Sequence, residues 1–105
     1  MAYEIHVGVR VEDEAGYQAY REGMYPILQK YQGDFVFDLS VDKLLKSPLE
    51  EAVNRVFIIR FCDQAKKEAF FSDPEYLAVR QQYFEPSVGY SAMLRAYDVE
   101  SGIEG

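Results

Sequence analysis

Apolar and polar residues alternate at the start of the chain. Between Tyr3 and Val11 the odd-numbered positions are apolar or aromatic, whereas the even-numbered positions are mixed in character. A period of two residues is typical of a β-strand, so this segment predicts a strand with one apolar face and one mixed face. The same alternation predicts a second strand from Phe35 to about Leu45.

Two further strands are expected in the second half of the chain. Residues Val53 to Cys62 are apolar on both faces at their centre, which is the pattern of an interior strand. Arg60 interrupts one of those faces. A last strand is expected from Gly89 to about Val99.

Helical spacing replaces the alternation after Asp13, which can cap the N-terminus of a helix. Apolar side chains then recur three or four positions apart. They are Tyr17, Tyr20, Met24, Ile27, Leu28 and Tyr31. Pro26 lies inside this pattern and predicts a kink or a tightening, and Gly33 is the natural residue to end the helix.

A second helix is expected after Asp63, another residue suited to an N-cap. The sequence Ser72-Asp73-Pro74 interrupts it, because Asp73 can cap a new first turn that begins with Pro74. The restarted helix should run to about Phe84. Between the second and third strands, Ser47-Pro48 indicates either one helical turn or a capped loop.

The order strand, helix, strand, strand, helix, strand predicts an α+β fold. Right-handed crossovers place both helices on one face of a four-stranded antiparallel sheet, with the first and third strands in the middle. The other face is then left uncovered. Burial of about 300 Å² of apolar surface there contributes roughly 7 kcal/mol before entropic costs. We therefore expect a homodimer that packs sheet to sheet.

Composition narrows the class of protein. The 105 residues indicate one domain, residues 1–99, followed by an acidic tail, residues 100–105. The formal net charge of −7 disfavours binding to nucleic acid and to anionic membranes. The single cysteine, Cys62, is interpreted as a small hydrophobic residue, with a reactive thiol as the alternative. With no signal peptide or membrane span in the sequence, we expect a cytoplasmic protein.

Two polar side chains on the central strands are candidates for chemistry. His6 is the one histidine, and it can act as a general base or be a hydrogen-bonded residue at the subunit interface. Arg60 can bind an anionic ligand, or it can pair with Asp38 or with an acidic residue of the other subunit. Metal ligands at a recognisable spacing, a phosphate loop and a dinucleotide motif are all lacking, so we expect no metal and no cofactor.

Several segments resemble one small family of unknown function, the domain of unknown function 1330. They are Asp13 to Tyr20, Tyr31 to Gly33, Arg55 to Phe61 and above all Phe71-Ser-Asp-Pro-Glu-Tyr76. The resemblance covers residues 3 to 98. It implies a ferredoxin-like βαββαβ fold that forms a dimeric α+β barrel, and it implies no particular reaction.

Related barrels hold small molecules between the sheet and the helices. By this resemblance Tyr17, Tyr20, Tyr76 and Tyr83 are expected to line such a cavity, with core packing as the alternative. Three functions stay open. The chain can be a cofactor-independent enzyme acting on a small organic molecule, a non-catalytic module that binds or senses such a molecule, or a structural interaction protein.

Overall fold

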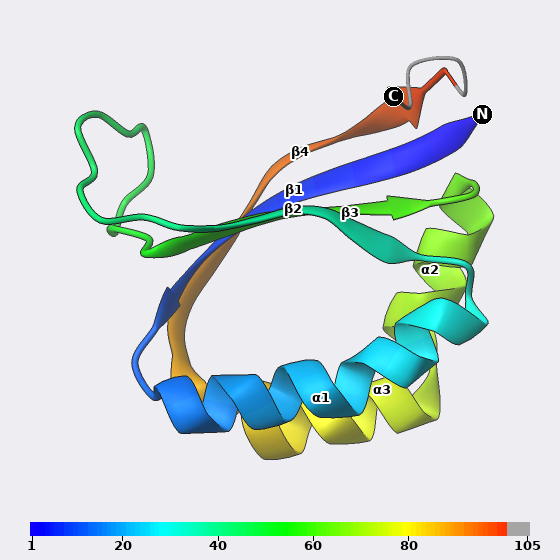
Figure 1. Ribbon diagram of the computed structural model, residues 1–105, viewed down its shortest axis with the longest axis horizontal. Helices are drawn as coiled ribbons and strands as arrows, with labels where there is room; N and C mark the ends of the chain where they lie inside the picture. Colours follow the sequence, from blue (N-terminus) through cyan, green and yellow to red (C-terminus); the bar gives the residue numbers. More distant parts are fainter. Residues whose placement is uncertain (101–105) are drawn as a thin grey trace.

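The elements follow one another in the predicted order (Figure 1). The computed structural model describes residues 1–100, so the expected acidic tail lies outside the described residues from position 101 on. The strands are β1 (Ala2–Val11), β2 (Asp34–Ser40), β3 (Arg55–Phe61) and β4 (Val88–Val99). The helices are α1 (Glu14–Lys30), α2 (Gln64–Ser72), α3 (Pro74–Val79), the π-helix η1 (Arg80–Phe84) and α4 (Glu85–Ser87).

The four strands form one antiparallel sheet in the order β2-β3-β1-β4. The predicted central position of the first and third strands is therefore confirmed. All the helices lie on the same side of this sheet (Figure 1). We call the opposite side the open face. Among the described residues, no helix is long and apolar enough to cross a membrane.

The core lies between the sheet and the helices. Residues of β1 and β3 alternate strictly, so that one set points at the helices. The buried members of this set are Tyr3, Ile5, Val9, Val11, Phe57, Ile59 and Phe61. They pack with the apolar side chains of α1 and with Phe70 of α2. Many of the helical partners are aromatic, so Tyr and Phe side chains fill the core of a chain that has no Trp.

A β-bulge in β2 changes which face of the sheet its side chains occupy. Phe35 is opposite Ile59, whereas Phe37 is opposite Ile58, so Val36 is the extra residue. Phe37 and Leu39 therefore lie on the open face, and Asp38 points toward the helices. The simple alternation expected for this strand is wrong beyond Val36.

The strand β2 also ends at Ser40, earlier than the predicted end near Leu45. The chain then leaves the sheet in a long loop to the start of β3 (Figure 1). Of the two alternatives for Ser47-Pro48, the capped loop is observed. Ser47 Oγ accepts a hydrogen bond from the amide of Leu49 at 3.0 Å, and no helix is assigned between β2 and β3 in this described segment.

The three predicted N-caps are confirmed. Asp13, Asp63 and Asp73 each accept hydrogen bonds from amides in the first turn of the following helix. The end of α1 differs from expectation, because Gln32 takes the left-handed conformation, with a φ of 61°. Gly33 is required for a different reason: a Cβ at this position would lie 2.6 Å from Leu28 Cδ1. The helix is assigned without interruption through Pro26.

Candidate functional site

A cavity of about 340 Å³ lies between the helices and the sheet. Its wall is mostly aromatic and aliphatic, with a few polar groups. The residues that line it are Val7, Tyr20, Met24, Phe57, Ile59, Phe71, Tyr76, Leu77, Arg80, Phe84, Ser91, Ala92 and Met93. Met24 and Ile59 are buried, whereas Leu77 and Met93 are about half exposed. The cavity therefore runs from a deep end in the core to a mouth between α3 and β4.

Two tyrosine hydroxyls meet in this cavity. Tyr20 of α1 and Tyr76 of α3 are hydrogen-bonded at 2.9 Å between their oxygen atoms, and both side chains are buried. The Phe84 ring packs against Tyr20, with ring centroids 4.9 Å apart. Phe70 packs against Tyr76 at 4.4 Å. The pair is thus a polar group set in an aromatic wall.

Burial raises the pKa of both hydroxyls, which are protonated near neutral pH. It raises the pKa of Tyr20 well above the usual value, and the nearby Tyr76 oxygen adds to this effect. Burial also raises the pKa of Tyr76, but the hydrogen bond to Tyr20 and the charge of Arg80 act in the opposite direction. The positive charge makes the Tyr76 hydroxyl a stronger hydrogen-bond donor. Either hydroxyl can donate within the pair, and when Tyr20 does so the Tyr76 proton is available to a ligand.

The turn before α3 sets the position of Tyr76. Asp73 Oδ1 accepts hydrogen bonds from the amides of Glu75, at 2.7 Å, and Tyr76, at 3.2 Å. Its Oδ2 accepts a hydrogen bond from the Tyr31 hydroxyl at 2.5 Å. This hydrogen bond, with those from the two amides, lowers the pKa of the Asp73 carboxyl. The cap fixes the first turn of the helix and with it the direction of Tyr76.

Arg80 lies at the mouth of the cavity, one helical turn beyond Tyr76. It is the first residue of the π-helix η1, a kind of distortion that is common at functional sites. Its guanidinium stacks over the Phe84 ring at 5.1 Å and contacts Glu85 at 3.4 Å. Among the described lining residues, Arg80 alone carries a formal charge at neutral pH.

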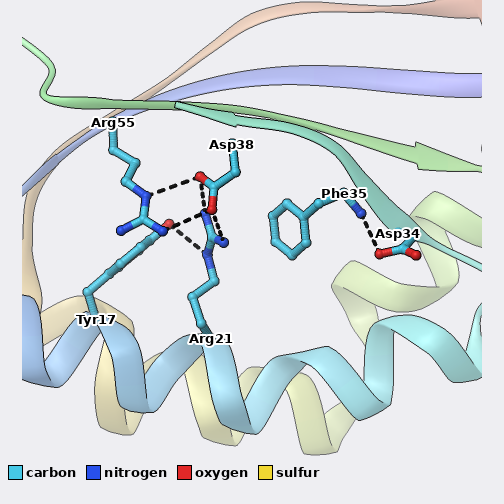
Figure 2. Close-up of polar contacts among 6 residues, drawn as sticks. All are labelled: Tyr17, Arg21, Asp34, Phe35, Asp38 and Arg55. Atoms are coloured by element: carbon cyan, nitrogen blue, oxygen red, sulfur yellow. Dashed lines mark hydrogen bonds and ion pairs between the residues drawn. The ribbon is translucent and has the colours of Figure 1, made fainter. Parts of the chain in front are cut away.

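A second polar cluster lies between α1 and the β2 side of the sheet (Figure 2). The Asp38 carboxylate accepts two hydrogen bonds from Arg21 and two from Arg55, at 2.9 to 3.1 Å. Tyr17 adds its hydroxyl, which accepts from Arg21 Nε at 3.0 Å. Burial by itself would raise the pKa of Asp38, but the hydrogen bonds from Arg55 and Arg21 lower it to about 2. This cluster ties α1 to the sheet.

The open face of the sheet holds a third polar group. Arg60 contacts the Glu4 carboxylate through Nε at 2.7 Å and through Nη2 at 2.5 Å. His6 Nε2 is 3.0 Å from the Tyr97 hydroxyl and 3.7 Å from Glu4 Oε1. Of the alternatives for Arg60, the pair with Asp38 is wrong, because the two side chains lie on opposite faces of the sheet.

The candidates named from the sequence are thus distributed over separate places. Tyr20 and Tyr76 line the cavity, and Tyr17 belongs to the Asp38 cluster. Tyr83 lies on η1, outside the lining, where its hydroxyl accepts from Gln82 at 3.2 Å. His6 and Arg60 lie on the open face. The catalytic or binding roles of all these residues stay predictions.

The lining residues that were not predicted from the sequence include Arg80, Ser91 and Met93. Spacing offered a signal for Arg80, because it follows Tyr76 by four positions and such residues share a helix face. No comparable signal existed for β4, since its place beside β1 is needed to bring Ser91 and Met93 to the cavity. Among the described residues, no group of three or more His, Cys, Asp or Glu side chains can hold a metal ion.

The antiparallel sheet with helices on one face defines a ferredoxin-like α+β protein. The model of the family described as domain of unknown function (DUF1330) matches residues 1–93, and the chain belongs to this family. The predicted family and fold are thereby confirmed. A search of the curated proteins finds no match.

Solved structures support the same fold. RPA0582, a protein of unknown function from Rhodopseudomonas palustris, is 18% identical with a TM-score of 0.80, over 95% of this chain and 83% of that one. A dimeric protein of unknown function and ferredoxin-like fold from Bacteroides fragilis is 13% identical (TM-score 0.61, 93% and 96% covered). A hydroxynitrile lyase from Passiflora edulis is 14% identical (TM-score 0.67, 95% and 94% covered). At these identities the likeness establishes the fold alone.

Proposed function

We propose that this protein binds a small organic molecule in the cavity between its helices and its sheet. The observation that carries the proposal is the buried Tyr20–Tyr76 hydroxyl pair inside a mostly apolar cavity of about 340 Å³. Ligand pockets combine an apolar wall with a few convergent polar groups in this way. Since water occupies about 30 Å³ per molecule in the liquid, a ligand of roughly ten to fifteen non-hydrogen atoms fits.

The two hydroxyls favour a ligand that presents an oxygen atom. Both phenols stay protonated near neutral pH, so they act as hydrogen-bond donors and not as bases. A carbonyl, carboxylate or enolate oxygen can accept from Tyr76 while Tyr20 supports that group from behind. The apolar side chains then cover the remainder of the ligand. Every group in this proposal belongs to the chain itself, and no cofactor takes part.

Catalysis without a cofactor is the second candidate function. Hydrogen-bond donors held in a dry pocket stabilise negative charge that develops on an oxygen during a reaction. The hydroxynitrile lyase from Passiflora edulis is an enzyme of this fold, which supports the possibility of a reaction here. In this role the tyrosine pair would bind the anionic transition state more tightly than the substrate.

A thermal-shift screen of small aromatic and aliphatic oxygen compounds tests the binding proposal. The cavity is blocked by Ser91→Phe, since Ser91 lies on the edge strand and lines the cavity. Ser40→Phe is the matched control, because Ser40 is also an exposed strand serine and lies outside the lining. We expect hits that stabilise the native protein and Ser40→Phe but not Ser91→Phe. Hits that survive in Ser91→Phe, or a screen without hits, would refute the proposal.

Turnover of a hit separates the two candidate functions. A hit that is consumed by the native protein, and is consumed much more slowly after Tyr76→Phe, supports catalysis. A hit that binds and is recovered unchanged supports a binding module. Either result retains the cavity as the site.

We also propose that the open face pairs with a second copy of the chain. Phe37 and Leu39 are 56% and 51% exposed there, beside Val56 and Ile58. Large exposed apolar side chains that cluster on one face indicate an interaction surface. The likeness to a protein of this fold that is described as dimeric supports a symmetric pair.

A further inference from the structure

The mouth of the cavity carries a positive charge, whereas its wall is apolar. We infer that the ligand is a small organic acid, whose carboxylate binds to Arg80 and the Tyr76 hydroxyl while its apolar body fills the cavity. This inference rests on the proposed function and adds the chemical class of the ligand. It follows from the placement of Arg80 among the lining residues.

The position of Arg80 suits this task. It follows Tyr76 by four residues, at the end of α3, so that both side chains lie on the same side of the helix. The Tyr76 hydroxyl is close enough to respond to the Arg80 charge. A guanidinium binds carboxylate oxygens through parallel N–H groups, and a phenol can donate to the same carboxylate.

The contacts that Arg80 makes leave it available to a ligand. Its ion pair with Glu85 is long, at 3.4 Å, and both side chains are substantially exposed, at 41% and 56%. Exposed ion pairs of this kind contribute little free energy. A cation–π contact with the Phe84 ring, 5.1 Å from the guanidinium carbon to the ring centroid, holds the guanidinium at the cavity. A ligand carboxylate can therefore replace Glu85 without disturbing the core.

Because of the charge of the whole chain, nonspecific binding and the proposed site predict opposite ligand preferences. A formal net charge of −7 repels anions in general and attracts cations. Preference for an acid must therefore come from the local site, and nonspecific binding would favour an amine. An affinity that decreases from the acid to the amide to the amine is therefore specific to the Arg80 site.

The test compares three probes of nearly equal shape at neutral pH: phenylacetate, phenylacetamide and 2-phenylethylamine. Binding is measured by calorimetry with the native protein, Arg80→Gln, Arg80→Lys and Lys66→Gln. Lys66 is a partly exposed cation of α2 outside the lining, so its removal matches the charge change alone. We expect phenylacetate to bind the native protein and Lys66→Gln about tenfold more tightly than phenylacetamide, and the amine to bind most weakly.

The variants show whether Arg80 causes the preference for the acid over the amide. Arg80→Gln should bring the acid and the amide within about twofold of each other, and Arg80→Lys should retain part of the preference because it keeps the charge but not the planar fork. Equal binding of acid and amide by the native protein would overturn the inference and leave the proposed function standing. An unchanged preference in Arg80→Gln would also overturn it. Failure of all three probes to bind would count against the proposed function itself.

Discussion

At the scale of single residues, hydroxyls and carboxylates between the helices and the sheet are positioned by partners far away in the sequence. Tyr20 and Tyr76 are 56 residues apart and share one hydrogen bond in the core. Asp38 gathers two arginines from a helix and a neighbouring strand. Such groups make each side chain depend on the others, because a buried donor or acceptor without a partner is costly.

Removal of one hydroxyl of the tyrosine pair should expose this dependence. Tyr20→Phe and Tyr76→Phe should each lower the free energy of unfolding by about 1 to 2 kcal/mol, because the remaining hydroxyl stays buried. The double variant should lose less than the sum of the two, by about 0.5 to 1 kcal/mol. Urea unfolding of the four proteins measures this coupling. Strict additivity would show that the hydrogen bond contributes nothing.

The Asp38 cluster predicts a dependence of stability on pH. Its folded pKa of about 2 lies below the usual value of 3.8 for an aspartate, so the ionised carboxylate favours the folded state. This contribution is complete above about pH 4 and is lost as the pH falls toward the folded pKa. Asp38→Asn should lower the unfolding free energy at neutral pH by about 1 kcal/mol, after allowance for solvent screening.

The pH dependence distinguishes this effect from a general loss of charge. The stability difference between the native protein and Asp38→Asn should shrink as the pH falls below about 4. Asp42→Asn is the control, because Asp42 is exposed in the loop after β2. A constant difference for Asp38→Asn across that range, or the same curve for both variants, would disprove the assignment.

At the scale of elements, the turn between α2 and α3 joins stability to the site. Asp73 accepts from two amides and from the Tyr31 hydroxyl, and it begins the helix that carries Tyr76 and Arg80. Asp63 caps α2 with one amide hydrogen bond, from Lys66. Both caps are aspartate side chains, but only Asp73 also accepts from a tyrosine and precedes the helix that carries Tyr76.

Asp73→Ala should therefore lower the melting temperature more than Asp63→Ala, and it alone should weaken ligand binding in the cavity. Asp73→Asn should restore part of both properties, since an amide oxygen can still cap the helix. Differential scanning calorimetry and the binding assay with phenylacetate measure the two effects. Equal losses from Asp63→Ala and Asp73→Ala would contradict the role of this turn.

The same elements mark how far the sequence determines the structure. The caps at Asp13, Asp63 and Asp73 and the central place of β1 and β3 follow from local patterns, and all were predicted correctly. The bulge at Val36 was not predicted, because the apolar alternation continues through it.

The error at Val36 extended to the candidate site. Asp38 was one of the partners considered for Arg60, whereas Arg60 pairs with Glu4 and Asp38 lies on the opposite face of the sheet. The cavity itself depends on side chains from α1, α3 and β4, which only the tertiary fold brings together. Tyr20 and Tyr76 were candidates because of a family likeness, whereas Arg80 was missed although it follows Tyr76 by the four positions that place two side chains on one helix face.

At the scale of the whole molecule, the helices cover one side of the sheet and leave the open face without a covering helix (Figure 1). We expect a mass near twice 12.1 kDa by light scattering at high micromolar concentration. Phe37→Lys should shift the protein toward 12.1 kDa, because it places a charge at the centre of the exposed apolar group. Leu45→Lys, in the loop after β2, should not. A native protein that stays at the monomer mass would contradict the sheet-to-sheet pair.

The most direct test of the cavity uses the methionine methyl groups. Met24 lies at the deep end of the cavity and Met93 at its mouth, whereas Met1 lies outside the lining. Protein that keeps Met1 and carries ¹³C in its methionine methyl groups is titrated with phenylacetate and observed by NMR. We predict that the Met24 and Met93 signals move together along one saturating curve while the Met1 signal stays in place. Saturation that leaves Met24 and Met93 unmoved would contradict the assignment of this cavity as a ligand site.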